Sequence, residues 1–267
     1  MSGYQISTNT SSILLIGGHD PSGAGMQADI ETIIMHKCHA ISVLTCTTAQ
    51  NTSTVNFVRP ISPDDFRTKI STLLEEFKPK VIKIGLVPNF ELCREINYFI
   101  ENIDHKTEII VDPIIRAGSG NELTEKSQST GLKTFLLTGT TLLTPNRSEL
   151  FALTQTNNFV ASLKHLFVLG VENILATDIT SDPGTITNAF ASRKSEKIFY
   201  YTHPRISGEF HGSGCTLASA IACGLAKSKN LNQSVLEGIH FANKAIANAH
   251  ELGIAQRIPD RSAGLTE

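Results

Sequence analysis

Short runs of apolar, mostly β-branched residues alternate with longer amphipathic stretches along most of this chain. The short runs predict buried strands, and the longer stretches between them predict helices. The predicted strands are 13–17, 41–46, 81–86, 108–111, 141–144 and 173–176, and the predicted helices are 24–36, 63–77, 90–103, 124–137, 147–153, 160–169, 212–226 and 231–252. Two further strands, 186–191 and 197–201, flank a polar turn and predict an antiparallel pair.

This alternation indicates βαβ units, in which successive strands run parallel and helices cover both faces of one sheet. We therefore expect an α/β protein of three αβα layers, with a mostly parallel central sheet and one small antiparallel strand pair. The chain has no internal repeat and no low-complexity linker, so residues 1–267 are predicted to form a single domain. Its ends, 1–10 and 260–267, are predicted to be flexible.

Composition limits the classes of partner. Of the 267 residues, 40% are hydrophobic and 18% are charged, and the net charge is -2. This charge, with Lys and Arg scattered along the chain, argues against nucleic acid or an anionic membrane surface as a partner. No apolar run is long enough to cross a membrane.

The cysteines are odd in number and include no Cys-x-x-Cys pair: Cys38, Cys46, Cys93, Cys215 and Cys223. This pattern argues against a disulfide framework or a zinc site, and it predicts a reducing compartment, the cytoplasm. Four of these residues are expected to be small buried hydrophobic side chains. Cys215 differs from them because it follows a glycine-rich turn.

That turn, Gly212-Ser213-Gly214-Cys215, runs directly into a predicted helix. Gly212 and Gly214 lack a Cβ, so their backbone is able to adopt positive φ and to approach a ligand closely. The unpaired N–H groups and the positive dipole end of a helix N-terminus predict an anion-binding site here. The same position is expected to favour the thiolate of Cys215. The alternative is a glycine turn that only begins a packed helix.

Polar residues follow several of the predicted strands: Gly18-His19-Asp20, Gln50-Asn51-Thr52, Asp112-Pro113 and Asn146. Ligands of parallel α/β proteins bind beyond the carboxyl ends of the strands, so we expect these residues to line one crevice. Asp112 is a candidate for holding a metal or phosphate-bound water, or it forms an ordinary Asx turn. Gln50 is able to bond the edge of a heterocycle, or it caps a loop.

Asn146 and Glu149 are three residues apart and share one face of a predicted helix. Both offer the hard oxygen ligands that suit magnesium, directly or through water. The alternative is an Asn N-cap followed by a carboxylate in the first turn. Asp29, inside an earlier helix, is either a solvated charge or a group that faces the crevice.

Taken in order, these segments resemble the hydroxymethylpyrimidine/hydroxymethylpyrimidine-phosphate kinases of thiamine biosynthesis, in the ribokinase-like superfamily. The cysteine of the glycine turn is characteristic, since most sugar and nucleoside kinases of the superfamily have aspartate there, whereas pyrimidine kinases and some pyridoxal kinases have cysteine. The resemblance runs from about residue 13 to residue 249 and rests on Gly18-His19-Asp20-Pro21-Ser22-Gly23, Gln27-Ala28-Asp29, Ala49-Gln50-Asn51-Thr52, Lys83-Ile84-Gly85, Val111-Asp112-Pro113, Leu143-Thr144-Pro145-Asn146 with Glu149, and His211-Gly212-Ser213-Gly214-Cys215-Thr216.

The resemblance implies phosphoryl transfer from MgATP to the hydroxymethyl group of the pyrimidine, and then to the resulting monophosphate. It implies that the glycine turn forms the anion hole and that Cys215 acts as the base near the acceptor oxygen. The other implied roles are in the binding of magnesium and nucleotide phosphates (Asn146 and Glu149, with Asp112 nearby) and of the pyrimidine (Gly18, Asp29, Thr48 and Gln50). It also suggests a homodimer, for which the apolar run Ile198-Phe199-Tyr200-Tyr201 is a candidate contact, although core packing explains that run equally well.

The sequence departs from the family pattern in two places. The loop 20–25 is one glycine shorter than the usual Asp-Pro-Ser-Gly-Gly-Ala-Gly. At the end of strand 173–176, the family has a lysine that contacts nucleotide phosphates, whereas this chain has Thr177 followed by Asp178. Lys194 and Lys197, on the predicted hairpin, are candidates to replace that charge.

These departures leave two alternatives to a working pyrimidine kinase. One is a catalytically impaired relative that binds the pyrimidine or its phosphate without turnover. The other is a pyridoxal-type kinase, since the cysteine turn occurs there too. Gln50 within the run Ala-Gln-Asn-Thr favours the pyrimidine.

Overall fold

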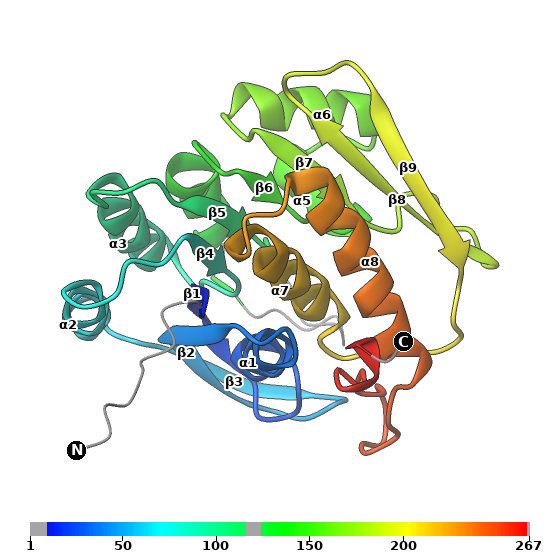
Figure 1. The fold of residues 1–267 in the computed structure, drawn as a ribbon, viewed down its shortest axis with the longest axis horizontal. Helices are drawn as coiled ribbons and strands as arrows, with labels where there is room; N and C mark the ends of the chain where they lie inside the picture. Colours follow the sequence, from blue (N-terminus) through cyan, green and yellow to red (C-terminus); the bar gives the residue numbers. More distant parts are fainter. Residues whose placement is uncertain (1–9, 116–123, 126, 266–267) are drawn as a thin grey trace, which may run out of the picture.

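A computed structural model describes residues 10–115, 124–125 and 127–265 of the chain. A nine-stranded sheet runs through it in the order β3-β2-β1-β4-β5-β6-β7-β8-β9 (Figure 1). The strands are β1 (Ser12–His19), β2 (His39–Gln50), β3 (Val55–Pro60), β4 (Val81–Ile84), β5 (Glu108–Val111), β6 (Leu142–Leu143), β7 (Asn173–Ala176), β8 (Thr185–Ser192) and β9 (Ile198–Pro204). Strands β2, β1, β4, β5, β6 and β7 are parallel neighbours, whereas β3, β8 and β9 pair antiparallel at the two edges.

Helices cover both faces of this sheet, which confirms the predicted αβα layers. The helices are α1 (Gly25–Met35), α2 (Pro63–Leu74), α3 (Phe90–Glu101), α4 (Gln128–Gly131), α5 (Arg147–Thr154), α6 (Phe159–Val168), α7 (Ser213–Ala226) and α8 (Leu231–Ala247). One buried apolar cluster joins the sheet to α2, α3, α5 and α6, and a second joins its other face to α1, α7 and α8. Figure 1 shows α7 and α8 lying side by side on that second face.

Several elements differ from the prediction. Strand β3 was not predicted, because its side chains are mostly exposed and carry no apolar run. The predicted helix 124–137 is reduced to α4 and a π-helical turn, Leu132–Leu136, and residue 126 lies outside the described residues. Helix α8 ends at Ala247 rather than at residue 252.

The predicted flexible end is wrong for residues 260–265. Asp260 donates its backbone N–H to the carbonyl of Ala245, 263–265 form a short 3-10 helix, and the Arg261 side chain is buried. These contacts are made with residues far away in the sequence, so no local pattern predicts them. Residues 1–9 and 266–267 lie outside the described residues.

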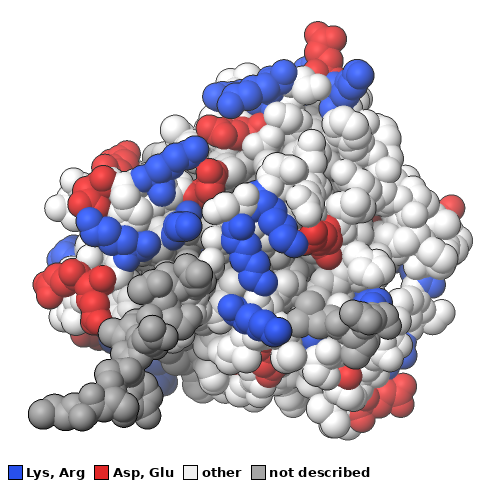
Figure 2. Space-filling model, in the orientation of Figure 1, with Lys and Arg blue, Asp and Glu red and all other residues white. Residues whose placement is uncertain are grey.

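Basic and acidic side chains are interspersed on the face of the molecule that Figure 2 shows, in keeping with the net charge of -2. Within the described ranges, no helix is long and apolar enough to cross a bilayer. All five cysteines are buried free thiols. The burial confirms the expectation for the four structural cysteines and extends it to Cys215.

Candidate active site

A cavity of about 650 Å³ opens at the carboxyl ends of the parallel strands, where the strand-end motifs predicted a crevice. Its lining comes from the ends of β1, β2, β5, β6 and β7, from the start of α5, and from the turn that leads into α7. The lining residues are Gly18, His19, Asp20, Ala24, Gly25, Gln50, Leu86, Asp112, Ile114, Ile115, Thr144, Asn146, Ser148, Glu149, Ala152, Thr177 and the run 210–215 with Leu217.

Two glycine-rich loops meet at the N-terminus of α7. Gly212 is the N-cap residue of this helix and has φ 82, as predicted, whereas Gly214 is helical and has no positive φ. A Cβ on Gly212 would lie 2.7 Å from the carbonyl oxygen of Gly23, so only glycine allows the two loops to touch. The first N–H groups of α7 have no partner within the helix, and the residues that carry them line the cavity.

Cys215 lies in this first turn and is 6% exposed. Burial raises the pKa of its thiol far above the ordinary value, and the neighbouring Lys83 offsets this only in part. Burial therefore opposes the expected thiolate more strongly than the helix N-terminus favours it. Asp112 raises the pKa of the thiol further, whereas the nearby backbone N–H of Gly25 lowers it slightly.

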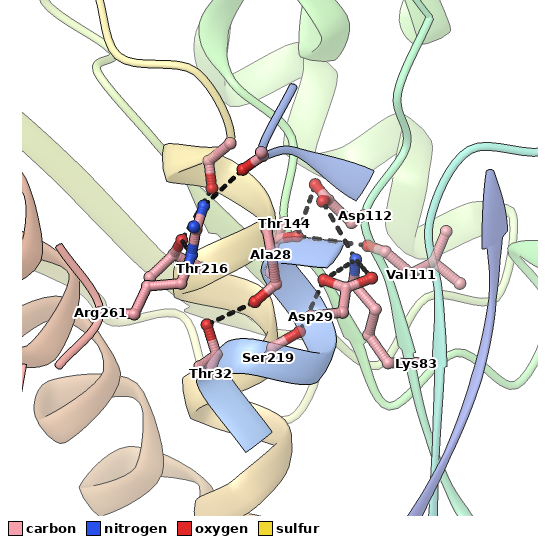
Figure 3. Close-up of polar contacts among 12 residues, drawn as sticks. Ala28, Asp29, Thr32, Lys83, Val111, Asp112, Thr144, Thr216, Ser219 and Arg261 are labelled. Carbon is pink, nitrogen blue, oxygen red and sulfur yellow. Dashed lines mark hydrogen bonds and ion pairs between the residues drawn. The ribbon is translucent and has the colours of Figure 1, made fainter. Parts of the chain in front are cut away.

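Below the cavity floor, a fully buried lysine holds two carboxylates together (Figure 3). The Nζ atom of Lys83 lies 2.9 Å from both carboxylate oxygens of Asp29 and 3.6 Å from Oδ2 of Asp112. Burial, the largest single effect, would lower the pKa of Lys83, but the opposing interactions, chief among them the negative charge of Asp29, together raise it. Ser219 of α7 donates to Asp29 at 2.8 Å, so the ion pair ties three elements together.

Asp112 is the member of this cluster that reaches the cavity. Burial raises its pKa, and Lys83 counteracts that effect in part. Its Oδ1 accepts a long hydrogen bond of 3.4 Å from Thr144, while its buried Oδ2 accepts none from the described residues. Asp29, by contrast, does not line the cavity, because its carboxylate is turned toward Lys83.

Asn146 and Glu149 form a complete capping box at the start of α5. The Asn146 side chain accepts from the N–H of Glu149 at 3.0 Å, and the Glu149 carboxylate accepts from the N–H of Asn146 at 2.9 Å. Both residues also line the cavity, so the capping role and a ligand role are compatible. Burial, reinforced by the nearby Asp112, raises the pKa of Glu149 to about 8.

The donor set suits a hard cation only in part. Within the described residues, no group of three or more His, Cys, Asp or Glu side chains is arranged to hold a metal ion. Glu149 and Asp112 nevertheless supply carboxylate oxygens to one cavity, and Oδ2 of Asp112 has a free acceptor site. Mg²⁺ is typically held by one or two carboxylates together with substrate phosphates and water, so these residues fit a magnesium ion that a nucleotide brings with it.

Of the residues predicted to surround the pyrimidine, Gly18 and Gln50 line the cavity. Thr48 does not. Its hydroxyl donates to the carbonyl oxygen of His19 at 2.9 Å, so it supports the strand end that carries Gly18. Gly18 has no room for a side chain, because a Cβ would lie 2.7 Å from the sulfur of Cys46.

Thr177 lines the cavity at the end of β7, and Asp178 beside it is neutralised by Arg205, with 2.6 Å between Nη2 and Oδ1. None of the described lining residues is a lysine or an arginine. Lys194 and Lys197, the candidate replacements, lie in or beside the β8–β9 turn and are not among the lining residues.

The sequence analysis assigned no role to the hydrogen bonds that join His211, in the turn before α7, to the loop after β1 and to Gln256. His211 Nε2 lies 2.6 Å from Oδ2 of Asp20 and 3.0 Å from the Ser22 hydroxyl, and Nδ1 lies 2.8 Å from Oε1 of Gln256. Burial opposes ionisation of Asp20, but the bonds from His211 and Ser22 prevail and lower its pKa. His211 and Asp20 belong to the quoted motifs, whereas nothing local to Gln256 signals its part.

Comparison with known proteins agrees with this geometry. A Bacillus subtilis hydroxymethylpyrimidine/phosphomethylpyrimidine kinase is 29% identical over 250 residues, which cover 90% of each chain. The structure of a Clostridium difficile phosphomethylpyrimidine kinase superposes with a TM-score of 0.76 at 26% identity, covering 89% of this chain and 100% of the other. A Staphylococcus aureus pyridoxal kinase solved in complex with ADP has a TM-score of 0.85 at 23% identity, covering 95% and 94%, and shows the shared fold.

Residues 20–259 match the protein family described as phosphomethylpyrimidine kinase. This match includes the ends of β2, β5, β6 and β7 that line the cavity, the loop 21–25 and the cysteine turn, and it begins directly after β1. The chain therefore belongs to the phosphomethylpyrimidine kinase family.

Proposed function

We propose that this protein transfers the γ-phosphoryl group of ATP to 4-amino-5-hydroxymethyl-2-methylpyrimidine and then to its monophosphate, in thiamine biosynthesis. The observation that carries the proposal is the cavity at the N-terminus of α7 in a chain of this family. In that cavity the glycine turn at the start of α7, Cys215 and the carboxylates of Asp112 and Glu149 face one space. Phosphoryl transfer requires chiefly such positioning and charge stabilisation.

The strand order supports a division of the cavity into two ends. Gly18 and Gln50 come from β1 and β2. Asn146, Glu149 and Thr177 follow β6 and β7, which are separated from β1 by β4 and β5 in the strand order. The pyrimidine would then bind above β1 and β2, and the nucleotide above β6 and β7. The turn 212–215 lies over the strands between them, where the phosphoryl group would pass from one to the other.

In this arrangement the N–H groups of Gly212 to Cys215 stabilise the charge on the transferring group. Asn146, Glu149 and Asp112 would hold Mg²⁺, whose contribution when bound is to neutralise charge on the phosphate oxygens. A base role for Cys215 requires its own proton to leave as the proton of the acceptor hydroxyl arrives. Asp112 lines the same cavity and has a raised pKa, so it is the carboxylate that would take this proton.

A coupled assay of ADP release tests the proposal on the wild type with the pyrimidine, with its monophosphate, with pyridoxal and without acceptor. We expect turnover with both pyrimidines that exceeds turnover with pyridoxal. Cys215→Ala should lower kcat by about a hundredfold or more. Cys223→Ala, which removes a second buried cysteine from the same helix, should stay near the wild-type rate.

Folded wild-type protein without turnover at saturating ATP and pyrimidine would refute the kinase. If the pyrimidine then raised the melting temperature, the impaired binder would replace it. A higher kcat/KM for pyridoxal than for either pyrimidine would instead assign the protein to pyridoxal-type kinases.

We further propose a cytoplasmic homodimer that pairs through the edge strand β9. Phe199 and Tyr200 are 47% and 56% exposed, so they lie outside the core. The five free thiols are in keeping with a reducing compartment. Analytical ultracentrifugation of the wild type and of Tyr200→Asp tests the contact, and an unchanged sedimentation coefficient would exclude it.

A further inference from the structure

Arg261 lies near the C-terminal end of the described chain, is 4% exposed, and contacts both glycine loops of the cavity (Figure 3). Its Nη2 donates to the carbonyl oxygen of Gly23 at 2.7 Å, and its Nε donates to the hydroxyl of Thr216 at 3.0 Å. That hydroxyl in turn donates to the carbonyl oxygen of Gly212 at 2.8 Å. One guanidinium therefore joins the loop 21–25 to the first turn of α7.

Arginine is suited to this position because its planar group fits the narrow space between the two loops and carries three nitrogens. A Cβ on Gly212 would lie 2.8 Å from Nη2 of Arg261, so the guanidinium fills the space between the loops. Nη1 of Arg261 also pairs with the partly exposed Glu31 on α1 at 2.7 Å. A lysine has one nitrogen and cannot reproduce this fork of three bonds.

The C-terminal segment makes a second connection to the same loops. Gln256 contacts His211 at 2.8 Å, and His211 contacts Asp20 at 2.6 Å. The backbone of Arg257 bonds on both sides of this turn, to the N–H of His211 and to the carbonyl of Glu209. Residues 256–261 thus hold the turn before α7 against the loop that follows β1.

The position of the loop 21–25 bears directly on Cys215, because Ala24 and Gly25 line the same cavity as Cys215, and the loop packs against Gly212 at the start of the cysteine turn. From this geometry we infer that Arg261 is a positioning residue for phosphoryl transfer, which sets the distance between the anion-binding turn and the loop beside the acceptor. The inference rests on the proposed kinase function. A misplacement of about 1 Å at a reacting centre lowers rates by about a hundredfold, without an equal effect on ground-state binding.

The test compares Arg261→Ala, Arg261→Lys and Glu31→Gln with the wild type, with kcat, KM for the pyrimidine and melting temperature measured for each. Arg261→Ala should lower kcat by about a hundredfold, and Arg261→Lys by about tenfold or more, with KM changed by less than about threefold. Glu31→Gln removes the ion pair but leaves both loop contacts, so kcat should stay within about twofold of the wild type.

Chemical rescue separates positioning from general stability. Arg261 also lines a second, more open cavity of about 840 Å³, which gives a small ion a route to its place. Guanidinium added to Arg261→Ala, below the concentrations that unfold the protein, should raise kcat by about tenfold, whereas methylammonium should not.

Each outcome is decisive. An inactive wild type would refute the proposed function, and a role of Arg261 in phosphoryl transfer would be refuted with it. An active wild type together with a folded Arg261→Lys of undiminished kcat would overturn the positioning role, whether or not Arg261→Ala folds. A lowered kcat in Arg261→Lys at an unchanged melting temperature supports it.

Discussion

Cys215 is subject to two opposing influences on its pKa. The helix N-terminus and Lys83 favour the thiolate, while burial and the neighbouring carboxylates disfavour it, and burial prevails. Cys38 offers a comparison at the same exposure of 6%, because its hydrogen bond with Cys223 lowers its pKa to about 7. Exposure being equal, the thiolate fraction should decide which of the two reacts.

Iodoacetamide should therefore modify Cys38 at a lower pH than Cys215. A thiol below its pKa gains about tenfold in thiolate for each pH unit, so alkylation of Cys215 should still rise steeply between about pH 8 and pH 10. The rate at Cys38 should level off above about pH 8. Peptide mass spectrometry over a pH series measures both sites. A plateau for Cys215 below pH 8 would contradict the raised pKa.

Thr177 lies where the family resemblance predicts a phosphate-binding lysine. Thr177→Lys should raise kcat/KM for ATP by about tenfold, because a charge-assisted contact would be added where the cavity has no described lysine or arginine. Thr177→Met is the matched control of similar length without charge. Equal kinetics in the two variants would show that no cation is missing there. The neutralised Asp178 should not oppose the new lysine, since Arg205 already pairs with it.

At the scale of elements, the contact between the two glycine loops depends on Gly212. Gly212→Ala should lower the free energy of unfolding by about 3 kcal/mol, from positive-φ strain and from the close contact with Gly23. Gly139 also has positive φ, but a Cβ there meets nothing within 4 Å. Gly139→Ala should thus cost only about 1 kcal/mol, the strain alone. Urea denaturation measures both, and equal losses would show that the loops do not touch.

The same elements show what local sequence is able to predict. Strands such as β1 and β4 are buried on both faces and appear as apolar runs, so their positions were predicted correctly. Strand β3 is exposed and gave no such signal. The residues lining the cavity were predicted where a strand end or a helix start carries them, as with Gln50 and Glu149. The part played by Arg261 depends on contacts across more than two hundred residues, which no local pattern contains.

At the scale of the whole molecule, Asp29 connects elements of the core. It does not line the cavity in which the pyrimidine was expected to lie beside it. It lies on α1, its partner Lys83 on β4 and its donor Ser219 on α7, so this buried group joins the sheet to two of the three helices of one layer. The group closes the cavity floor from below, and Asp112 is the carboxylate that it presents to the cavity.

Removing the charge of Lys83 alone should lower the free energy of unfolding more than removing the charges of Lys83 and Asp29 together. Lys83→Met leaves the Asp29 carboxylate buried without its cation, so it should lower the free energy of unfolding by about 3 to 5 kcal/mol. Adding Asp29→Asn removes the stranded charge, and the double variant should recover at least about half of that loss. Urea denaturation of both single variants and the double variant gives the coupling. A double variant as unstable as the sum of the singles would show that the two side chains act independently, and that packing rather than charge holds this layer together.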